Sequence, residues 1–535
     1  MTVSEAVSAP ATPTPNAPLV RIDKITLTDF RGFPGPAPAI FNLGGKNLLV
    51  YGENGSGKSS LFYALTEFFS LKPTRPLSAY KNVFSGQAQA DCKVSIEFVG
   101  DAQAVDWTVS AHPCVLDFST PVDDWYTYTF GDTDTRTLDA ALRAACLDYK
   151  SLLNTNFRHG EGAINLFAIA VEHLLSDYPV PRAGITTTLG KLWAEVQEAT
   201  PENGKEKEKE KEKKKTYSIE KINQACLDFN TAFQPALLAL LPQINALMHA
   251  LGWQEVVLTA LQSPGLAYQP AKLKRDRVLN GQVLEPKLTF RNQPLERPQT
   301  FLNEARLSAL GLALYLAGRL TSTPTAPSSA LKLLVLDDVL IGLDHSNRLP
   351  VLDVLADLFS DWQIVLMTHD RGWFDLARHH LSDGNWACYE IYEGDTSATA
   401  PMPIVRKTEK RPAPALLAKG RQLLLLGYVE AAANYTRQAF ESGLRGACEF
   451  QKVPMNYTAD PSAHKAQDFL DALKKSPKPT KVAQADWSAC LQRIEMFKKV
   501  VMNPYSHPSA PNIPRQEVVD AADAVEKFLE LAGKK

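Results

Sequence analysis

The chain has 535 residues, of which 45% are hydrophobic and 22% charged, so its length predicts two or three domains and its composition a globular protein. A formal net charge of −2 excludes a global basic field for nucleic acid, although a local basic patch is still allowed. The seven cysteines form no CxxC pair, which argues against a zinc site and for a reducing compartment, and no stretch is apolar for long enough to span a bilayer.

The first part of the chain predicts a leader followed by strands and a helix. Residues 1–19 are rich in Ala, Pro and Thr and lack the apolar core of a signal peptide, so we expect a disordered leader on a cytoplasmic protein with no membrane partner. The alternation in "RIDKITLTDFRGF" predicts a half-buried strand. "KNLLVYGENGSGKSSLFYALTEFF" predicts a buried strand, a Gly-rich turn and a helix, and "CKVSIEFVG" and "VDWTVSAH" two more strands.

A helical insertion is expected over about residues 135–265. Its runs include "LDAALRAACLDYKSLL", "AINLFAIAVEHLL" and "INQACLDFNTAFQPALLALLPQINALM". Residues 205–215, "KEKEKEKEKKK", cannot bury a face and predict a solvated loop or helix tip. Because no heptad pattern is sustained, the insertion indicates a compact lid and not a long coiled-coil arm.

The second half of the sequence predicts further strands and helices of the α/β domain, followed by a region of helices alone. "EPKLTFRNQ", "LKLLVLDDVL" and "DWQIVLMTHD" are strand-like, and "FLNEARLSALGLALYLAGRL" is a strong amphipathic helix. The Pro- and Thr-rich residues 396–414 predict a linker, and residues 415–535 an all-α bundle. The fold class is therefore α/β: an α/β head over residues 20–395 with a helical insertion, followed by the bundle.

"GENGSGKS", residues 52–59, fits the phosphate-binding pattern GxxxxGK[ST] at every position and lies between a strand and a helix, as the mechanism requires. Its glycines let backbone N–H groups turn toward phosphates, and the helix N-terminus adds a positive dipole end. Lys58 should reach the β- and γ-phosphates, and Ser59 should hold Mg²⁺. The residues expected to contact ATP here are Gly52, Asn54, Gly55, Gly57, Lys58, Ser59 and Ser60.

The strand "LLVLDDVL" supplies acidic partners for this loop. Asp337 follows four apolar residues and should emerge at the carboxyl end of its strand, where open α/β sheets bind ligands. We expect Asp337 to hold Mg²⁺ through water and Asp338 to orient or deprotonate the attacking water.

The ordered set of these motifs resembles the ABC-type ATPase heads of the SMC/RecF-like clan. "ITLTDFRGF" resembles the opening strand, whose arginine, here Arg31, contacts nucleotide. "LNEARLSALGLALYLA" resembles the signature motif and its helix, with Leu302–Arg306 where LSGGQ would stand. "LLVLDDVLIGLD" resembles Walker B and a D-loop ending at Asp344, and "VLMTHD" the switch strand, with His369 as the sensor of the γ-phosphate.

The resemblance implies that ATP joins two heads, because the signature of one head completes the site of the other. Asn303, Glu304, Arg306 and Asp344 are then the expected cofactor contacts across a homodimer or higher homo-oligomer. Two positions depart from the pattern: the signature lacks its double glycine, and Asp338 stands where a glutamate is usual. No Q-loop glutamine is identifiable, although "DYKSLLN" lies in that region.

The last helices carry a candidate trio. Arg437 and Glu441 are four residues apart in "ANYTRQAFESGLR" and so share a helix face, and His507 follows in "MNPYSH". On the residues alone, this is a surface pair and a lone histidine of a kind that more often caps a helix than catalyses.

These segments also resemble a HEPN-type helical domain, and the trio resembles that of prokaryotic anticodon nucleases of the PrrC and RloC kind, which join an ABC head to a C-terminal ribonuclease. The resemblance implies that Arg437 stabilises a phosphorane, Glu441 orients Arg437 or a base, and His507 acts as general acid or base toward the ribose 2′-OH without a metal. The more widespread HEPN motif has an arginine roughly six residues before the histidine, where this chain has Val501.

Two functions follow. The first is an ATPase that controls an appended ribonuclease, with RNA such as tRNA as substrate and a role in antiviral defence. The second is an ATP-dependent nucleic-acid sensor or clamp whose helical domain docks a separate nuclease. A second protein or a nucleic acid would act as the trigger in either case.

Overall fold

The computed structural model divides into two compact units, residues 1–407 and 408–535. It describes residues 19–70, 73–101, 103–114, 137, 140–141, 145–153, 163–182, 185–200, 219–271, 277–322, 331–381, 384–394, 401–408, 412–455, 464–502 and 514–533. The expected charged loop at 205–215 and almost all of the expected leader lie outside these residues. None of the helices in the described part is long and apolar enough to cross a membrane.

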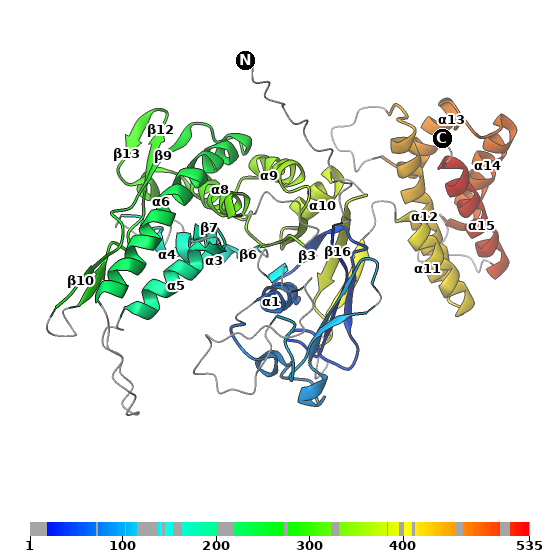
Figure 1. The fold of residues 1–535 in the computed structure, drawn as a ribbon. Helices are drawn as coiled ribbons and strands as arrows, with labels where there is room; N and C mark the ends of the chain where they lie inside the picture. The colour runs from blue at the N-terminus through cyan, green and yellow to red at the C-terminus, as the bar shows by residue number, and fades with distance from the viewer. Residues whose placement is uncertain are drawn as a thin grey trace, which may run out of the picture. The chain divides into compact units, whose positions relative to one another are not determined.

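A six-stranded sheet in the order β17-β16-β3-β15-β14-β6 forms the centre of the first unit (Figure 1). Its strands are β3 (Asn47–Gly52), β6 (Ala145–Asp148), β14 (Leu333–Asp337), β15 (Gln363–Thr368), β16 (Trp386–Tyr392) and β17 (Ile404–Thr408). The pairs β16–β3, β3–β15, β15–β14 and β14–β6 are all parallel. Their carboxyl ends therefore lie along one edge, as the motif analysis requires.

The continuous apolar runs of these strands are explained by burial on both faces. In β14, Leu333 and Val335 belong to one core cluster, whereas Leu334 and Leu336 belong to another. The same alternation holds in β3 and β15. Side chains alternate between the faces of a strand, so a run without polar residues fits a sheet covered on both sides.

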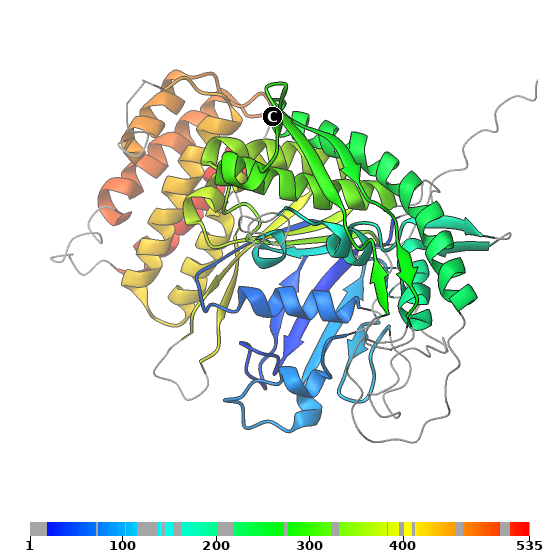
Figure 2. The same cartoon turned by 90° about the vertical axis from the view of Figure 1, so that its left-hand side faces the viewer.

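One face of this sheet packs against α1 (Lys58–Phe68) and an antiparallel sheet in the order β2-β1-β4-β5, which share one core with it. Figure 2 shows α1 and the antiparallel sheet, in blue, on one side and the green helices on the other. The antiparallel strands are β1 (Ile22–Thr28), β2 (Ala39–Asn42), β4 (Lys93–Phe98) and β5 (Val105–Trp107), with the short 3₁₀ helices η1 (Leu77–Tyr80) and η2 (Gln89–Asp91) before β4.

The other face carries the helical lobe, which is built around a long helix, α6 (Ile219–Ala250), packed against α8 (Glu304–Ser322) and α5 (Leu189–Ala199). Its other helices are α3 (Tyr149–Leu153), α4 (Phe167–Ile169), the π-helix η4 (Ala170–Leu174), α7 (Pro298–Phe301), α9 (His345–Leu358) and α10 (Arg371–His380). Its strands are β7 (Pro179–Arg182), β8 (Ile185–Thr188), β9 (Val256–Gln262), β10 (Ala267–Gln269), β11 (Val278–Asn280), β12 (Glu285–Phe290) and β13 (Gln293–Leu295).

Two expectations about the first unit are wrong. Ala145–Asp148, expected to be helical, form strand β6 at one edge of the central sheet, because the short run "ACLD" pairs with β14. Ile404–Thr408, expected within a linker, form strand β17 at the other edge, next to β16. In each case a neighbouring strand supplies hydrogen bonds that local sequence does not reveal.

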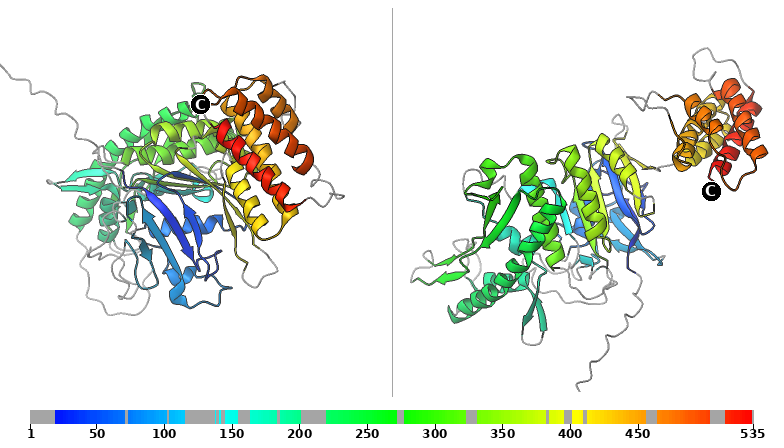
Figure 3. Two further views of the ribbon diagram at one scale, coloured as in Figure 1. Left: turned by 90° about the vertical axis from the view of Figure 1, so that its right-hand side faces the viewer. Right: turned by 90° about the horizontal axis from the view of Figure 1, so that it is seen from above.

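The second unit is a helical bundle with its own core (Figure 3). Its helices are α11 (Ala413–Leu425), α12 (Val429–Phe450), α13 (Ala466–Lys475), α14 (Gln484–Phe497), the π-helix η7 (Lys498–Met502) and α15 (Arg515–Ala532). The helix α12 packs against α11, α13, α15 and η7. Its apolar residues recur every three or four positions, which places Phe440, Leu444 and Cys448 in the core.

Candidate nucleotide-binding site

The loop Gly52–Ser59 connects the carboxyl end of β3 to the start of α1, and its glycines are required by the backbone. Gly55 and Gly57 have φ angles of 88° and 105°, which side chains rarely tolerate. A Cβ at Gly52 would lie 2.5 Å from Ser56 Oγ. Ser56 is fully buried, and its hydroxyl has no hydrogen-bond partner among the described residues. The loop is therefore a tight turn in which the buried Ser56 hydroxyl can still form a hydrogen bond.

Lys58 brings the loop to the acidic end of β14. Its Nζ lies 3.6 Å from Asp337 Oδ1 and also pairs with Asp338 Oδ2. Lys58 is 6% exposed and Asp337 is 8% exposed, so this contact is largely withdrawn from water. Charges in such a place interact strongly because solvent screens them little. The structure thus unites the two motifs across 280 residues of sequence.

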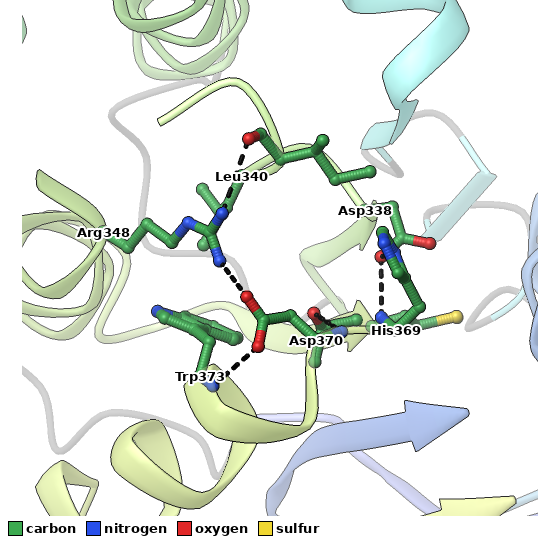
Figure 4. A pocket seen from close by; sticks show the side chains of 9 residues that line it. Asp338, Leu340, Arg348, His369, Asp370 and Trp373 are labelled. Carbon is green, nitrogen blue, oxygen red and sulfur yellow. Dashed lines mark hydrogen bonds and ion pairs between the residues drawn. The ribbon is translucent and has the colours of Figure 1, made fainter. Parts of the chain in front are cut away.

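His369 completes the cluster from the end of β15. Its backbone N–H donates to Asp338 Oδ1 at 2.9 Å, and its ring Nδ1 lies 2.9 Å from the same oxygen (Figure 4). Asp338 has a φ of 54°, an uncommon conformation for a residue other than glycine. Asp338 is therefore held on both sides, by Lys58 through Oδ2 and by His369 through Oδ1.

The electrostatics of the cluster favour a cation. Burial raises the pKa of Asp337 to about 6, with Lys58 opposing and the carboxylates of Asp338 and Asp148 adding to the rise. Asp337 Oδ1 is buried and has no hydrogen-bond partner among the described residues, although it lies near Lys58. Unsatisfied carboxylate oxygen beside other carboxylates suits Mg²⁺, so the residues present fit that ion.

Asp148 is a residue of this cluster that the sequence analysis missed. It ends β6 in register with Asp337. Since Leu147 belongs to the core of the helical lobe, Asp148 faces the opposite side, toward α1, as Asp337 does. Its Oδ1 accepts bonds from Ser151 N and Oγ at 2.8 and 2.5 Å. The signal was available, because "ACLD" repeats the apolar-run-then-acid pattern of "LLVLD".

Arg31 and Ser60 lie beside the loop. The Arg31 guanidinium stacks on the Tyr63 ring at 4.2 Å, on α1. Ser60 Oγ accepts a bond from Gly32 N at 3.1 Å, so it ties the segment after β1 to α1. Asn54 and Ser59 are exposed. The structure therefore places Arg31 at the helix that follows the loop and gives Ser60 a structural bond.

The segment expected to be the signature lies at the start of α8. Asn303 Oδ1 accepts the Arg306 N–H at 3.1 Å, as a helix-capping side chain does. Arg306 pairs with Glu255 at 3.1 Å and lies over the Trp253 and Phe290 rings, both at 5.1 Å. These contacts belong to its own lobe, so they give Arg306 a packing role.

A groove joins this segment to the expected D-loop. Its walls include Asn303 and Glu304 on one side and Gly342 and Asp344 on the other. A Cβ at Gly342 would lie 2.1 Å from the Ser308 hydroxyl, so the D-loop backbone rests directly on α8. Asn303, Glu304 and Asp344 are exposed, which leaves this surface open to another molecule.

The C-terminal candidates are less constrained. Arg437 Nε pairs with Glu441 Oε1 at 2.8 Å on one face of α12, and both side chains are about one third exposed. His507 lies outside the described residues. Lysines on α13 and η7 are engaged within this unit: Lys474 and Lys499 pair with Glu495, and Lys498 donates to Gln467. Burial lowers the pKa of Lys498. The carboxylate of Glu495 therefore neutralises part of the positive charge of this surface.

No protein-family model matches the chain, and no curated protein matches it. Solved structures that resemble it include an SMC head bound to the C-terminal winged-helix domain of ScpA, with 12% identity, a TM-score of 0.35, and coverage of 73% of this chain and 98% of that one. An SMC head domain from Thermotoga maritima has 13% identity and a TM-score of 0.30, and the match covers 73% of this chain and 99% of that one. The recombination mediator RecF with ATP has 12% identity and a TM-score of 0.41, and the match covers 73% of this chain and 98% of that one. TM-scores this low establish neither the family nor the function of this chain.

Proposed function

We propose that the first unit binds ATP with Mg²⁺ at residues 52–59 and hydrolyses it. The observation that supports this proposal is the meeting of Lys58, Asp337, Asp338 and His369, which come from three different chain segments, at the edge where the strands end. A scaffold has no need of a buried lysine facing two carboxylates, whereas phosphoryl transfer needs such charges held in place.

Each residue then has a role that its position permits. The loop N–H groups and the N-terminus of α1 face the phosphates, and Lys58 exchanges its carboxylate partners for phosphate oxygens. Ser59, Asp337 and Asp148 would hold Mg²⁺, which neutralises developing negative charge when it is bound. Asp338 would accept the proton of the attacking water, oriented by His369. In the described part of the chain, no protein-only cluster could hold a metal, so phosphate and water would supply the remaining ligands.

We further propose that two heads close around ATP. The groove of Asn303, Glu304 and Asp344 is open on the surface, and its backbone is fixed by the contact of Gly342 with Ser308. An exposed but rigid polar surface is suited to a nucleotide held by a second copy. Arg306 would support this surface through Glu255 and would not contact phosphate itself.

The second unit would then be a ribonuclease controlled by the head. In this proposal His507 takes the proton of a ribose 2′-OH, the oxygen attacks the adjacent phosphorus, and the bond to the 5′-oxygen breaks as that oxygen takes a proton from water, which gives a 2′,3′-cyclic phosphate and a 5′-hydroxyl. The chain supports it by placing Arg437 and Glu441 in an ion pair on α12, against which η7 packs. RNA such as tRNA, and a defence role, are parts of this proposal.

The second candidate is a sensor or clamp that docks a separate nuclease. The turn between α11 and α12 favours it, because Leu425, Leu426 and Tyr428 are 82%, 64% and 61% exposed. Consecutive exposed apolar side chains of this kind are typical of protein contact sites. Under this candidate, a Leu425→Asp/Leu426→Asp variant would lose a co-purifying partner.

One experiment separates the two candidates. The purified protein is incubated with total tRNA, with and without ATP and Mg²⁺, and the cut ends are mapped. The ribonuclease proposal expects cyclic-phosphate ends that are absent from His507→Ala and changed in amount by Lys58→Ala. Cleavage by the His507→Ala variant at the wild-type rate would show that the trio is not the active site. ATP turnover without RNA cleavage would favour the sensor.

A further inference from the structure

Arg348, on the first turn of α9, connects two segments of the proposed site. Its Nη1 lies 2.7 Å from Asp370 Oδ2, its Nε donates to the carbonyl oxygen of Leu343 at 2.8 Å, and its Nη2 donates to that of Ile341 at 3.4 Å. The side chain is only 11% exposed. Figure 4 shows the guanidinium group between the D-loop backbone and Asp370.

The bond to Asp370 connects Arg348 with the proposed catalytic residues His369 and Asp338. Asp370 caps α10 by accepting the Trp373 N–H at 3.0 Å, and its own N–H donates to Thr368 Oγ1 at 3.1 Å. It directly follows His369, which is bonded to Asp338 through both its backbone and its ring. A shift of Asp370 therefore moves the residue that orients the proposed base.

The bonds to the carbonyl oxygens of Leu343 and Ile341 connect Arg348 with the groove. Ile341 and Leu343 flank Gly342, whose backbone rests on Ser308 of α8. Ile341 and Arg348 line both this groove and the pocket that contains Asp338 and His369. A molecule that presses on the groove would therefore act on the carbonyl groups that Arg348 holds.

We propose that Arg348 is a positioning residue that couples occupancy of the groove to the placement of His369 and Asp338. The inference rests on the proposed ATPase function and adds a route by which closure of two heads is transmitted to hydrolysis. A guanidinium group suits this role because it is planar and can bond three acceptors at once, which an ammonium group on a flexible stem does not reproduce. Coupling of this kind requires contiguous, well-packed contacts, and Arg348 supplies them.

The experiment measures ATP affinity and turnover separately in four variants. Arg348→Met removes all three bonds, Arg348→Lys keeps a charge for Asp370, and Asp370→Asn keeps an acceptor for the helix cap without the charge. The matched control is Arg378→Met, because Arg378 is 18% exposed in the same unit and pairs with Asp375 on α10. We expect Arg348→Met to lower kcat about tenfold with the Kd for ATP changed less than about twofold. Arg348→Lys should give a loss of about threefold, and Arg378→Met no change.

A double-variant cycle tests whether the bond to Asp370 carries the effect. The Arg348→Met/Asp370→Asn protein should be no slower than the worse single variant, because both changes remove one interaction. Additive losses, or a loss of ATP affinity equal to the loss of kcat, would overturn the proposal and leave Arg348 a structural residue.

Hydrogen exchange supplies a readout that does not depend on turnover. ATP and Mg²⁺ should protect residues 47–60 in wild type and Arg348→Met alike, but should protect residues 338–345 only in wild type. Equal protection of residues 338–345 in both proteins would overturn the coupling. If ATP protects neither segment in the wild type, the proposed ATPase function itself fails, so the two failures are distinguishable.

Discussion

The two candidate sites of this protein differ in how far the chain had to fold to make them. At the phosphate loop, Lys58, Asp338 and His369 come from distant parts of the sequence and meet within hydrogen-bonding distance. On α12, Arg437 and Glu441 are one helical turn apart, and any helix with these residues could pair them. Burying charges costs desolvation free energy, which their pairing only partly offsets, whereas an exposed local pair costs little. The first site is therefore the stronger candidate on physical grounds.

The largest expected effect is on ATP binding. Replacing Lys58 with alanine removes a buried cation from the phosphate position, so we expect the Kd for a fluorescent ATP analogue to rise roughly a hundredfold or more. Lys24→Ala is the matched control, because Lys24 is also paired with a carboxylate, that of Glu97, but on the antiparallel sheet. Wild-type affinity in Lys58→Ala would remove the basis for ranking this site first.

Asp338→Asn should separate binding from chemistry. The amide keeps the shape of the side chain but cannot accept a proton, so turnover should fall about a hundredfold while ATP still binds. Steady-state hydrolysis and analogue binding, measured side by side, check this expectation. A turnover within about threefold of wild type would show that another group is the base.

The first unit should lose stability in acid. His112 in this unit is buried with its Nε2 2.8 Å from Glu67 O, and burial lowers its pKa to about 4. The unfolded chain binds the proton first as pH falls through its ordinary value of 6.5, so stability is lost between about pH 7 and pH 4. We expect a loss of about 2 kcal/mol between pH 7.5 and pH 5.

Urea unfolding of wild type and His112→Gln at the two pH values measures this loss. The variant should be less stable at pH 7.5 but should lose about 2 kcal/mol less on acidification. An identical pH dependence in both proteins would mean that His112 is not the group responsible.

Asp148→Asn tests the missed carboxylate. Removing one negative charge beside Asp337 should raise the Mg²⁺ concentration needed for half-maximal ATP-analogue binding about tenfold, with affinity at saturating Mg²⁺ little changed. Ser151 can still donate to the remaining amide oxygen, so the strand end should keep its shape. An unchanged Mg²⁺ requirement would remove Asp148 from the cation site.

The smallest effect is on the stability of the second unit. Arg437→Ala breaks an exposed pair and should cost less than about 0.5 kcal/mol. Arg421→Ala, which breaks pairs with Asp523 and Glu526, is the matched control in the same unit. If RNA cleavage is lost in Arg437→Ala but kept in Arg421→Ala, the site on α12 would be supported as strongly as the site at the phosphate loop.

The sequence by itself determined the parts of this protein that depend on local patterns. The loop Gly52–Ser59, the buried strands around it, and helices such as α12 follow from glycine spacing and apolar periodicity, which neighbouring residues alone can express.

Only the tertiary structure decided which strands pair and therefore which side chains meet. The edge strands β6 and β17 were expected to be helix and linker, because strand pairing depends on partners far along the chain. Asp148 was missed with β6, since the short run "ACLD" is identified as a strand end only by its pairing with β14. The bonds of Arg348 to Asp370, Leu343 and Ile341 were equally invisible, since sequence spacing does not say which carbonyl a guanidinium group will reach.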